Sequence, residues 1–151
     1  MTLIRAILAT AAASAAVFVV TAASAQQDVV KSRQDLMKRS GQQMAVVNRM
    51  VRGQEAFDAA KVNAAFDAFA DKAQKLPSLF PAESRKIESR ALPKIWDDPK
   101  AWNAEVAKFA KNVADGRAKA VSGVDGLKAA VAPLVADCSS CHEGFRRPAQ
   151  R

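Results

Sequence analysis

The chain has 151 residues, of which 50% are hydrophobic, and it carries a formal net charge of +8. The basic residues are scattered rather than clustered with aromatic residues, so the charge does not indicate nucleic-acid binding; it favours acidic partners, anionic membrane surfaces or simply a solvated basic surface. Beyond the N-terminus no apolar stretch is long enough to span a bilayer, which argues against a membrane-spanning domain.

The first 25 residues predict a cleavable export signal. Arg5 precedes an apolar run from Ala6 to Val20, and the segment ends in the small residues Ala23-Ser24-Ala25. This pattern is typical of a Sec-type signal peptide cut before Gln26, whereas a retained membrane anchor would need a longer and less alanine-rich run. We therefore expect residues 1–25 to be a signal peptide and residues 26–151 to form one mature domain.

Apolar residues in the next segment, about residues 28–51, recur at helical spacing. Val30, Met37, Met44 and Val51 follow one another every seven residues, while lysines and arginines occupy the other face. A helix with such a stripe must bury it against another element. The residues around Gly53 then interrupt the pattern and end the helix.

Two further helices are expected on either side of a long connection. The second runs from about Asp58, a candidate N-cap, to Leu76, and the third from Pro99, which suits a first helical turn, to about Val121. The residues on their apolar faces are Val62, Phe66, Phe69, Ala70 and Ala73 in the second helix and Trp102, Val106, Phe109 and Val113 in the third.

The connection from Pro77 to Pro99 contains four prolines, which argue against one continuous helix because proline lacks a backbone N–H. Its apolar residues indicate that it packs over the domain rather than extending into solvent. A short helix is expected within it, near residues 84–89.

The fourth expected helix begins near Asp125, a candidate N-cap, and ends near Arg146. One face carries apolar residues together with both cysteines and the histidine: Leu127, Val131, Leu134, Val135, Cys138, Cys141, His142 and Phe145. Pro133 lies inside this helix and should bend it or cost it one backbone hydrogen bond.

The sequence Cys138-Ser139-Ser140-Cys141-His142 contains the only two cysteines and the only histidine of the chain. This spacing is typical of covalent haem attachment, in which each thiol adds across one vinyl group and the histidine binds the iron. A structural zinc site would need further Cys or His ligands, and a thioredoxin-like pair would need a strand before the motif. A local disulfide stays open, although it leaves the adjacent histidine unexplained.

Four amphipathic helices with two short joins and one long one predict an all-α, antiparallel four-helix bundle with the covalently bound haem in its core. Haem of this type is attached outside the cytoplasm, and the export signal agrees with that site of attachment. We therefore expect the protein in a bacterial periplasm.

The chain resembles the class II cytochromes c, the cytochrome c′ family, over essentially all of residues 26–151. In that family the haem motif lies at the C-terminal end of the fourth helix of an all-helical domain. The segments that carry the resemblance are Arg33-Gln34, Gly53-Gln54, Pro93 to Trp96 and Cys138 to Arg146. Two more segments, Leu36-Met37-Lys38 and Leu76 to Pro81, are most similar to the low-spin branch, cytochrome c-556.

This resemblance implies one haem c and a set of residues around it. The implied residues are Cys138 and Cys141 as thioether anchors, His142 as the proximal iron ligand, Arg146 near the proximal face, and Arg33 and Gln34 along the haem edge. High-spin members have a residue such as leucine where this chain has Met37, which favours Met37 as the second iron ligand. An exposed surface position for Arg33, and a contact with the helix dipole for Arg146, are the alternatives.

The rise of an α-helix also favours Met37 over the other methionines. In an antiparallel pairing the start of the first helix lies beside the end of the fourth, and at 1.5 Å per residue Met37 is about 14 Å from that start and His142 about 6 Å from that end. Met44 and Met50 lie about 24 and 33 Å along the helix. The alternative is that Met37 only packs in the core, as methionines in an apolar stripe commonly do.

Two functions from different classes stay open. The favoured one is one-electron transfer by a low-spin haem whose His and Met ligands leave no open iron site. The alternative is a five-coordinate haem that binds nitric oxide or carbon monoxide; a thiol-disulfide enzyme is a distant third, because no acid, base and nucleophile set is evident. We expect no enzymatic activity, redox proteins as partners, acidic ones among them, and either a monomer or a homodimer.

Overall fold

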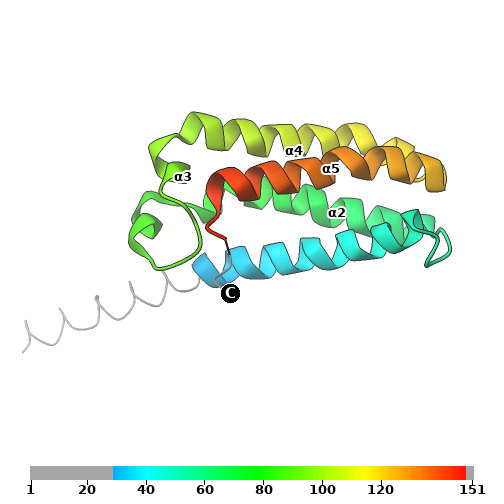
Figure 1. Ribbon diagram of the computed structural model, residues 1–151, viewed down its shortest axis with the longest axis horizontal. Helices are drawn as coiled ribbons and strands as arrows, with labels where there is room; N and C mark the ends of the chain where they lie inside the picture. The colour runs from blue at the N-terminus through cyan, green and yellow to red at the C-terminus, as the bar shows by residue number, and fades with distance from the viewer. Residues whose placement is uncertain (1–28, 149–151) are drawn as a thin grey trace, which may run out of the picture.

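The computed structural model describes residues 29–148, and the predicted signal peptide and its cut before Gln26 lie outside these residues. Four long helices run lengthwise beside one another in alternating directions (Figure 1). They are the first helix, residues 29–51, and then α2 (Ala59–Lys75), α4 (Pro99–Ala120) and α5 (Val124–Phe145). The predicted all-α four-helix bundle is confirmed.

The helix starts follow local capping chemistry. The Asp58 carboxylate accepts hydrogen bonds from the backbone N–H groups of Ala60 and Lys61 at 2.9 and 3.1 Å, so the predicted cap of α2 is confirmed. The predicted cap of α5 is wrong. That helix starts one residue before Asp125 and follows Gly123, whose φ of 132° is a conformation that favours glycine.

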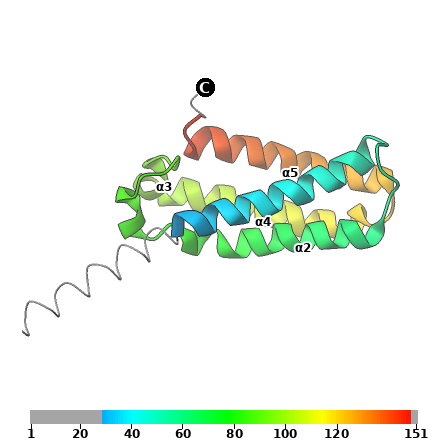
Figure 2. The ribbon, with the colours of Figure 1, turned by 90° about the horizontal axis from the view of Figure 1, so that it is seen from below.

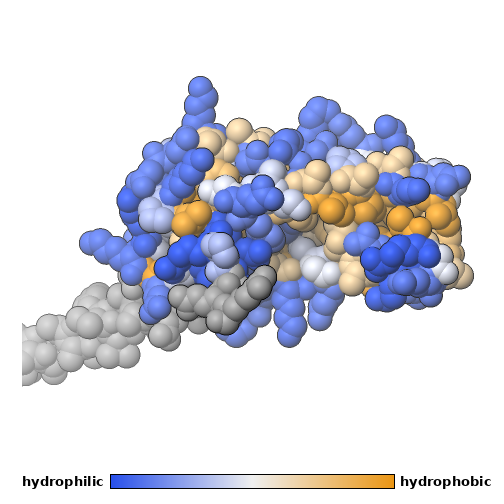
Figure 3. Space-filling view, viewed as in Figure 1, coloured by the Kyte–Doolittle hydropathy of each residue, from blue (hydrophilic) through white to orange (hydrophobic). Residues whose placement is uncertain are grey.

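The face of α5 that packs inward differs from the predicted stripe, because Ala130 and Asp137 are also buried and one predicted member is not. Val131, Leu134 and Phe145 are buried as expected, but Val135 is 42% exposed. Apolar side chains on this side of the molecule gather toward the end of the bundle where α5 begins (Figure 3). The helix passes through Pro133 without a break, and Val131 and Leu134 on either side of the proline are buried.

The connection between α2 and α4 folds as three short turns: η1 (Pro77–Leu79), η2 (Ala82–Lys86) and α3 (Lys94–Asp97). The short helix expected near residues 84–89 is present as η2, which starts two residues earlier, and α3 was not foreseen. The indole Nε1 of Trp96 donates to the carbonyl oxygens of Phe80 and Pro81, both at 3.1 Å, which folds the connection back on itself. The expectation that it packs over the domain is confirmed.

One end of the bundle brings together the start of the first helix, the connection and the end of α5 (Figures 1 and 2). Ala91 and Arg146 form an isolated antiparallel bridge, with hydrogen bonds of 3.0 Å from Leu92 N to Phe145 O and 2.8 Å from Arg147 N to Arg90 O. The last turn of α5 is thus tied to the connection.

The buried apolar side chains form two separate clusters. The larger cluster consists of Val47, Met50, Val62, Ala65, Phe66, Phe69, Phe109, Val113, Ala120, Leu127, Ala130, Val131 and Leu134, and the smaller of Leu36, Leu76, Ile95, Trp102, Val106 and Phe145. The interior is therefore packed in two parts. Within residues 29–148, none of the helices combines the length and the apolar character needed to cross a bilayer.

The tight corner between α4 and α5 predicts different effects for two glycines of α5. A Cβ atom at Gly126 would overlap the Lys119 carbonyl oxygen and the Ser122 Oγ, whereas one at Gly144 meets no atom within 4 Å. Gly126→Ala should lower the free energy of unfolding by about 1–3 kcal/mol. Gly144→Ala should change it by less than about 1 kcal/mol. Urea unfolding of the haem-bearing proteins measures both, and equal effects would contradict the close packing of this corner.

Candidate functional site

The motif near the end of α5 opens onto a cavity. Cys138, Cys141 and His142 are half-buried, both thiols are free, and all three residues line a space of 620 Å³. Burial raises the pKa of the Cys141 thiol. Burial also lowers the pKa of His142, as do the positive charges of Arg146, Lys72 and Arg90, so the neutral imidazole, the form that binds metals, is favoured.

The other helices complete the walls of this cavity. The first helix contributes Met37 and Met44, and the remaining apolar wall residues come from both core clusters: Phe69 and Phe109 from the larger, Leu76 and Val106 from the smaller. The cavity is thus where the two halves of the interior meet. Its volume lies within the range of about 300–1,000 Å³ that is usual for sites of small molecules and cofactors.

A second cavity of 280 Å³ lies beside the first, under the connection. Met37, Cys141, His142 and Arg146 line both cavities. Arg33 and Gln34 line the second, together with Phe80, Trp102 and Phe145. All seven residues named as candidates from the sequence therefore border one or both spaces.

The three methionines within residues 29–148 occupy different environments. Met37 is half-buried and lines both cavities, whereas Met44 lines only the larger one. Met50 is 1% exposed and packs in the larger core cluster, and Met1 lies outside the described residues. Val30, Met37 and Met44 of the predicted every-seventh-residue stripe each line a cavity and are half-buried. Val51, also half-buried, packs against the larger core cluster instead.

Arg33 is only 6% exposed, so its interpretation as a surface residue is wrong. Its Nε donates to the carbonyl oxygen of Leu79 and its Nη2 to the Oγ of Ser84, and its guanidinium carbon lies 4.1 Å from the centroid of the Phe80 ring. Burial lowers its pKa. The third nitrogen, Nη1, is buried and has no hydrogen-bond partner in the described part of the chain. A buried unpaired donor beside a cavity suits an anionic group such as a carboxylate.

Gln34 and Arg146 are both exposed at the rim of the smaller cavity. Arg146 follows the last residue of α5, and its backbone N–H donates to the carbonyl oxygen of His142 at 3.2 Å. At this position the Arg146 side chain lies near the C-terminal end of the helix dipole and also borders the cavities in which a group could bind.

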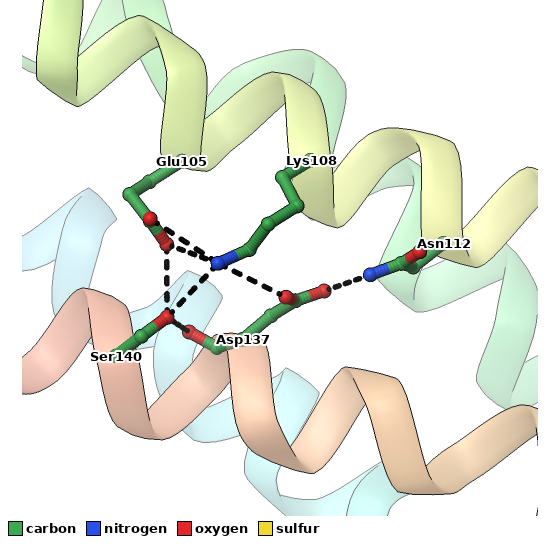
Figure 4. Close-up of polar contacts among 5 residues, drawn as sticks. All are labelled: Glu105, Lys108, Asn112, Asp137 and Ser140. Carbon is green, nitrogen blue, oxygen red and sulfur yellow. Dashed lines mark hydrogen bonds and ion pairs between the residues drawn. The ribbon is translucent and has the colours of Figure 1, made fainter.

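A polar network that was not foreseen from the sequence holds the motif against α4 (Figure 4). Asp137 is 5% exposed, and its carboxylate accepts a 2.7 Å hydrogen bond from Asn112 Nδ2 and lies 3.5 Å from Lys108 Nζ. Ser140, inside the motif, donates to Glu105 Oε2 at 2.9 Å. The turn that carries the cysteines is therefore held against α4 through both Asp137 and Ser140.

The donors around the cavities fit a covalently bound haem. Two thiols and a histidine stand on one helix, a thioether on another, and an unpaired guanidinium nitrogen lies near by, in apolar surroundings. Within residues 29–148 no group of three or more His, Cys, Asp or Glu residues is arranged to hold a metal ion, so the zinc alternative gains no support.

Comparisons with known proteins point to one family of haem proteins. The family model described as Cytochrome C′ matches residues 28–146. The chain is 39% identical over 139 residues to cytochrome c-556 of Rhodopseudomonas palustris, a match that covers 89% of this chain and 93% of that protein. Among solved structures, cytochrome c′ from Rhodopseudomonas palustris superposes with a TM-score of 0.75 at 33% identity, covering 82% of this chain and 98% of that one. The NMR-validated structural model for oxidized R. palustris cytochrome c556 gives 0.73 at 36% identity, covering 82% and 99%.

The network predicts a pH-dependent contribution of Glu105 to stability. Hydrogen bonds from Lys108 and Ser140 hold the pKa of Glu105 below its ordinary value of 4.5. Because a lowered carboxyl pKa stabilises the fold above the unfolded value and loses that effect as pH falls, Glu105→Gln should cost about 1 kcal/mol at neutral pH and progressively less below pH 4.5. Glu143→Gln, at an exposed position without an ion pair in residues 29–148, is the control for urea unfolding. A Glu105→Gln effect that is independent of pH would contradict the assignment.

Proposed function

The chain belongs to the cytochrome c′ family of haem-binding proteins, which carry a covalent c-type haem, and from this premise we propose that it is a one-electron carrier with a six-coordinate, low-spin His/Met haem. When bound, the haem iron takes up and releases single electrons. The residues of the chain bind that group, orient it and limit access to it. We further propose that the protein has no enzymatic activity of its own.

Residues of α5 provide the attachment in this proposal. Cys138 and Cys141 hold the haem through two thioethers, and His142 binds the iron through a ring nitrogen that burial keeps unprotonated. The Asp137 and Ser140 contacts to α4 keep this turn in one orientation. A rigid attachment favours electron transfer because little of the surrounding structure has to rearrange.

The observation that carries the proposed ligand set is the position of Met37. It lies on the first helix, while His142 lies on α5, and these two residues line both cavities. Met44 lines only the larger space and Met50 is packed in the core. Met37 is therefore the methionine best placed to supply a thioether to iron that His142 holds, and such a ligand would leave no position for nitric oxide or carbon monoxide.

Arg33 and its neighbours would hold the polar edge of the haem. The buried, unpaired Nη1 of Arg33 can donate to a propionate, and Gln34 and Arg146 lie at the rim of the same cavity. Ser84 and Leu79 fix the Arg33 side chain, so it would meet the carboxylate in a set orientation.

We also propose that the protein works in the periplasm and exchanges electrons with redox proteins. The motif requires attachment outside the cytoplasm, and the segment before Gln26 has the pattern of an export signal. A net charge of +8 favours acidic partners through electrostatic steering. Either a monomer or a homodimer is consistent with this role.

Export with cleavage before Gln26 predicts the N-terminus and the mass of the purified protein. Expressed with its own leader in a bacterium that attaches c-type haem, the protein should begin at Gln26 and have the mass of residues 26–151 plus one haem. Intact-mass spectrometry measures this. A chain that retains Arg5 and still carries covalent haem would contradict the proposed cleavage.

Met37→Leu should open the iron to external ligands. The ferric spectrum of this variant should lose the weak near-infrared band of methionine-to-iron charge transfer and shift toward high spin. The ferrous form should bind carbon monoxide more tightly, and the reduction potential should fall, since His/Met ligation raises it.

Met44→Leu is the matched control, because it makes the same change two turns farther along the first helix and should leave the spectrum nearly intact. If the parent protein is already high-spin, or if Met37→Leu leaves a low-spin spectrum unchanged, the His/Met proposal fails. A high-spin parent would favour the gas-binding alternative.

A further inference from the structure

Lys72 of α2 is a lysine inside the bundle. Its side chain is only 7% exposed, and it lines the 620 Å³ cavity together with Cys138, Cys141 and His142. Lysine is almost never fully buried unless it is paired, because removing an ammonium from water is costly. The burial of Lys72 in the cavity wall therefore needs a physical reason.

The described residues offer Lys72 little compensation. Its ammonium forms no hydrogen bond and no ion pair with residues 29–148, and the Nζ atom lies 3.7 Å from the centroid of the Phe109 ring, a cation–π contact. The carboxylate that acts on it through charge is that of Asp137. That carboxylate is already engaged, with Asn112 at one oxygen and Lys108 at the other (Figure 4). The wall of the cavity thus carries a positive charge that its neighbours do not neutralise.

The charged form of Lys72 is compatible with this environment. Burial is the main influence on the pKa of the ammonium and lowers it. The sulfurs of Cys138 and Cys141, which would carry no charge as thioethers, and the carboxylate of Asp137 act in the opposite direction. The face of the Phe109 ring further favours the cation over the neutral amine.

We propose that the Lys72 ammonium raises the reduction potential of the haem held in this cavity by opposing the extra positive charge of the ferric state. Reduction adds one electron, supplied by the redox partner, and moves no proton in this step. In the low-dielectric interior a fixed charge acts on the iron far more strongly than one at the surface. Net charge and burial are among the means by which proteins set haem potentials. The inference rests on the proposed role as an electron carrier.

The test compares midpoint potentials of haem-bearing variants at neutral pH, in low and in high salt. Lys72→Met removes the charge and keeps an unbranched chain, so its potential should shift to more negative values by an amount that salt barely changes. Lys72→Arg, which stays charged, should remain near the parent. Lys75→Met removes an exposed charge from the next turn of α2, and its smaller shift should shrink in high salt.

Lys72→Gln serves as a second neutral variant if the methionine variant does not fold. A potential equal to that of the parent in the neutral variant, or a Lys75→Met shift of the same size, would overturn the proposal. So would a changed ferric spin state in the neutral variant, because Lys72 would then act on the ligand set rather than through its charge. The parent spectrum tests His/Met ligation separately, since a potential can be measured for either ligand set.

Discussion

The physical constraint on this bundle is that side chains do not fill its interior where the first helix faces the end of α5. Two packed clusters, one toward the α4–α5 corner and one under the connection, meet at a cavity of 620 Å³. Walls around such a space give up the dispersion contacts that a filled core provides. A large, flat, apolar cofactor anchored at Cys138 and Cys141, as we propose, would supply those contacts, so the group that carries the electron would also join the two halves of the core.

Other parts of the fold keep the walls of this space in place. The connection between α2 and α4 holds Arg33 through the Leu79 carbonyl oxygen and Ser84 Oγ, and it pairs with the end of α5 through the bridge between Ala91 and Arg146. From the other side, α4 holds the motif through the Asp137 and Ser140 contacts. The helix with the thiols and the helix with Met37 are therefore each held by contacts with other parts of the fold.

Features that depend on neighbours in the sequence were predictable, and those that depend on distant contacts were not. The helices, the cap at Asp58 and the haem motif follow from local spacing and chemistry. The burial of Arg33 could not be foreseen, because it depends on a connection 46 residues away. The exposure of Val135 and Ala70 likewise depends on where the neighbouring helices pack. The burial of Lys72 could have been predicted, because Lys72 lies three residues after Phe69 and four before Leu76, on the buried side of α2.

We propose above all that the iron in this bundle is held between His142 of α5 and the Met37 thioether of the first helix. X-ray absorption at the iron edge of the purified, reduced protein tests it without a substitution, because sulfur and nitrogen ligands scatter differently. The account predicts five nitrogen ligands, four from the ring and one from His142, and a single sulfur ligand. A spectrum with five nitrogen ligands and no sulfur would contradict it.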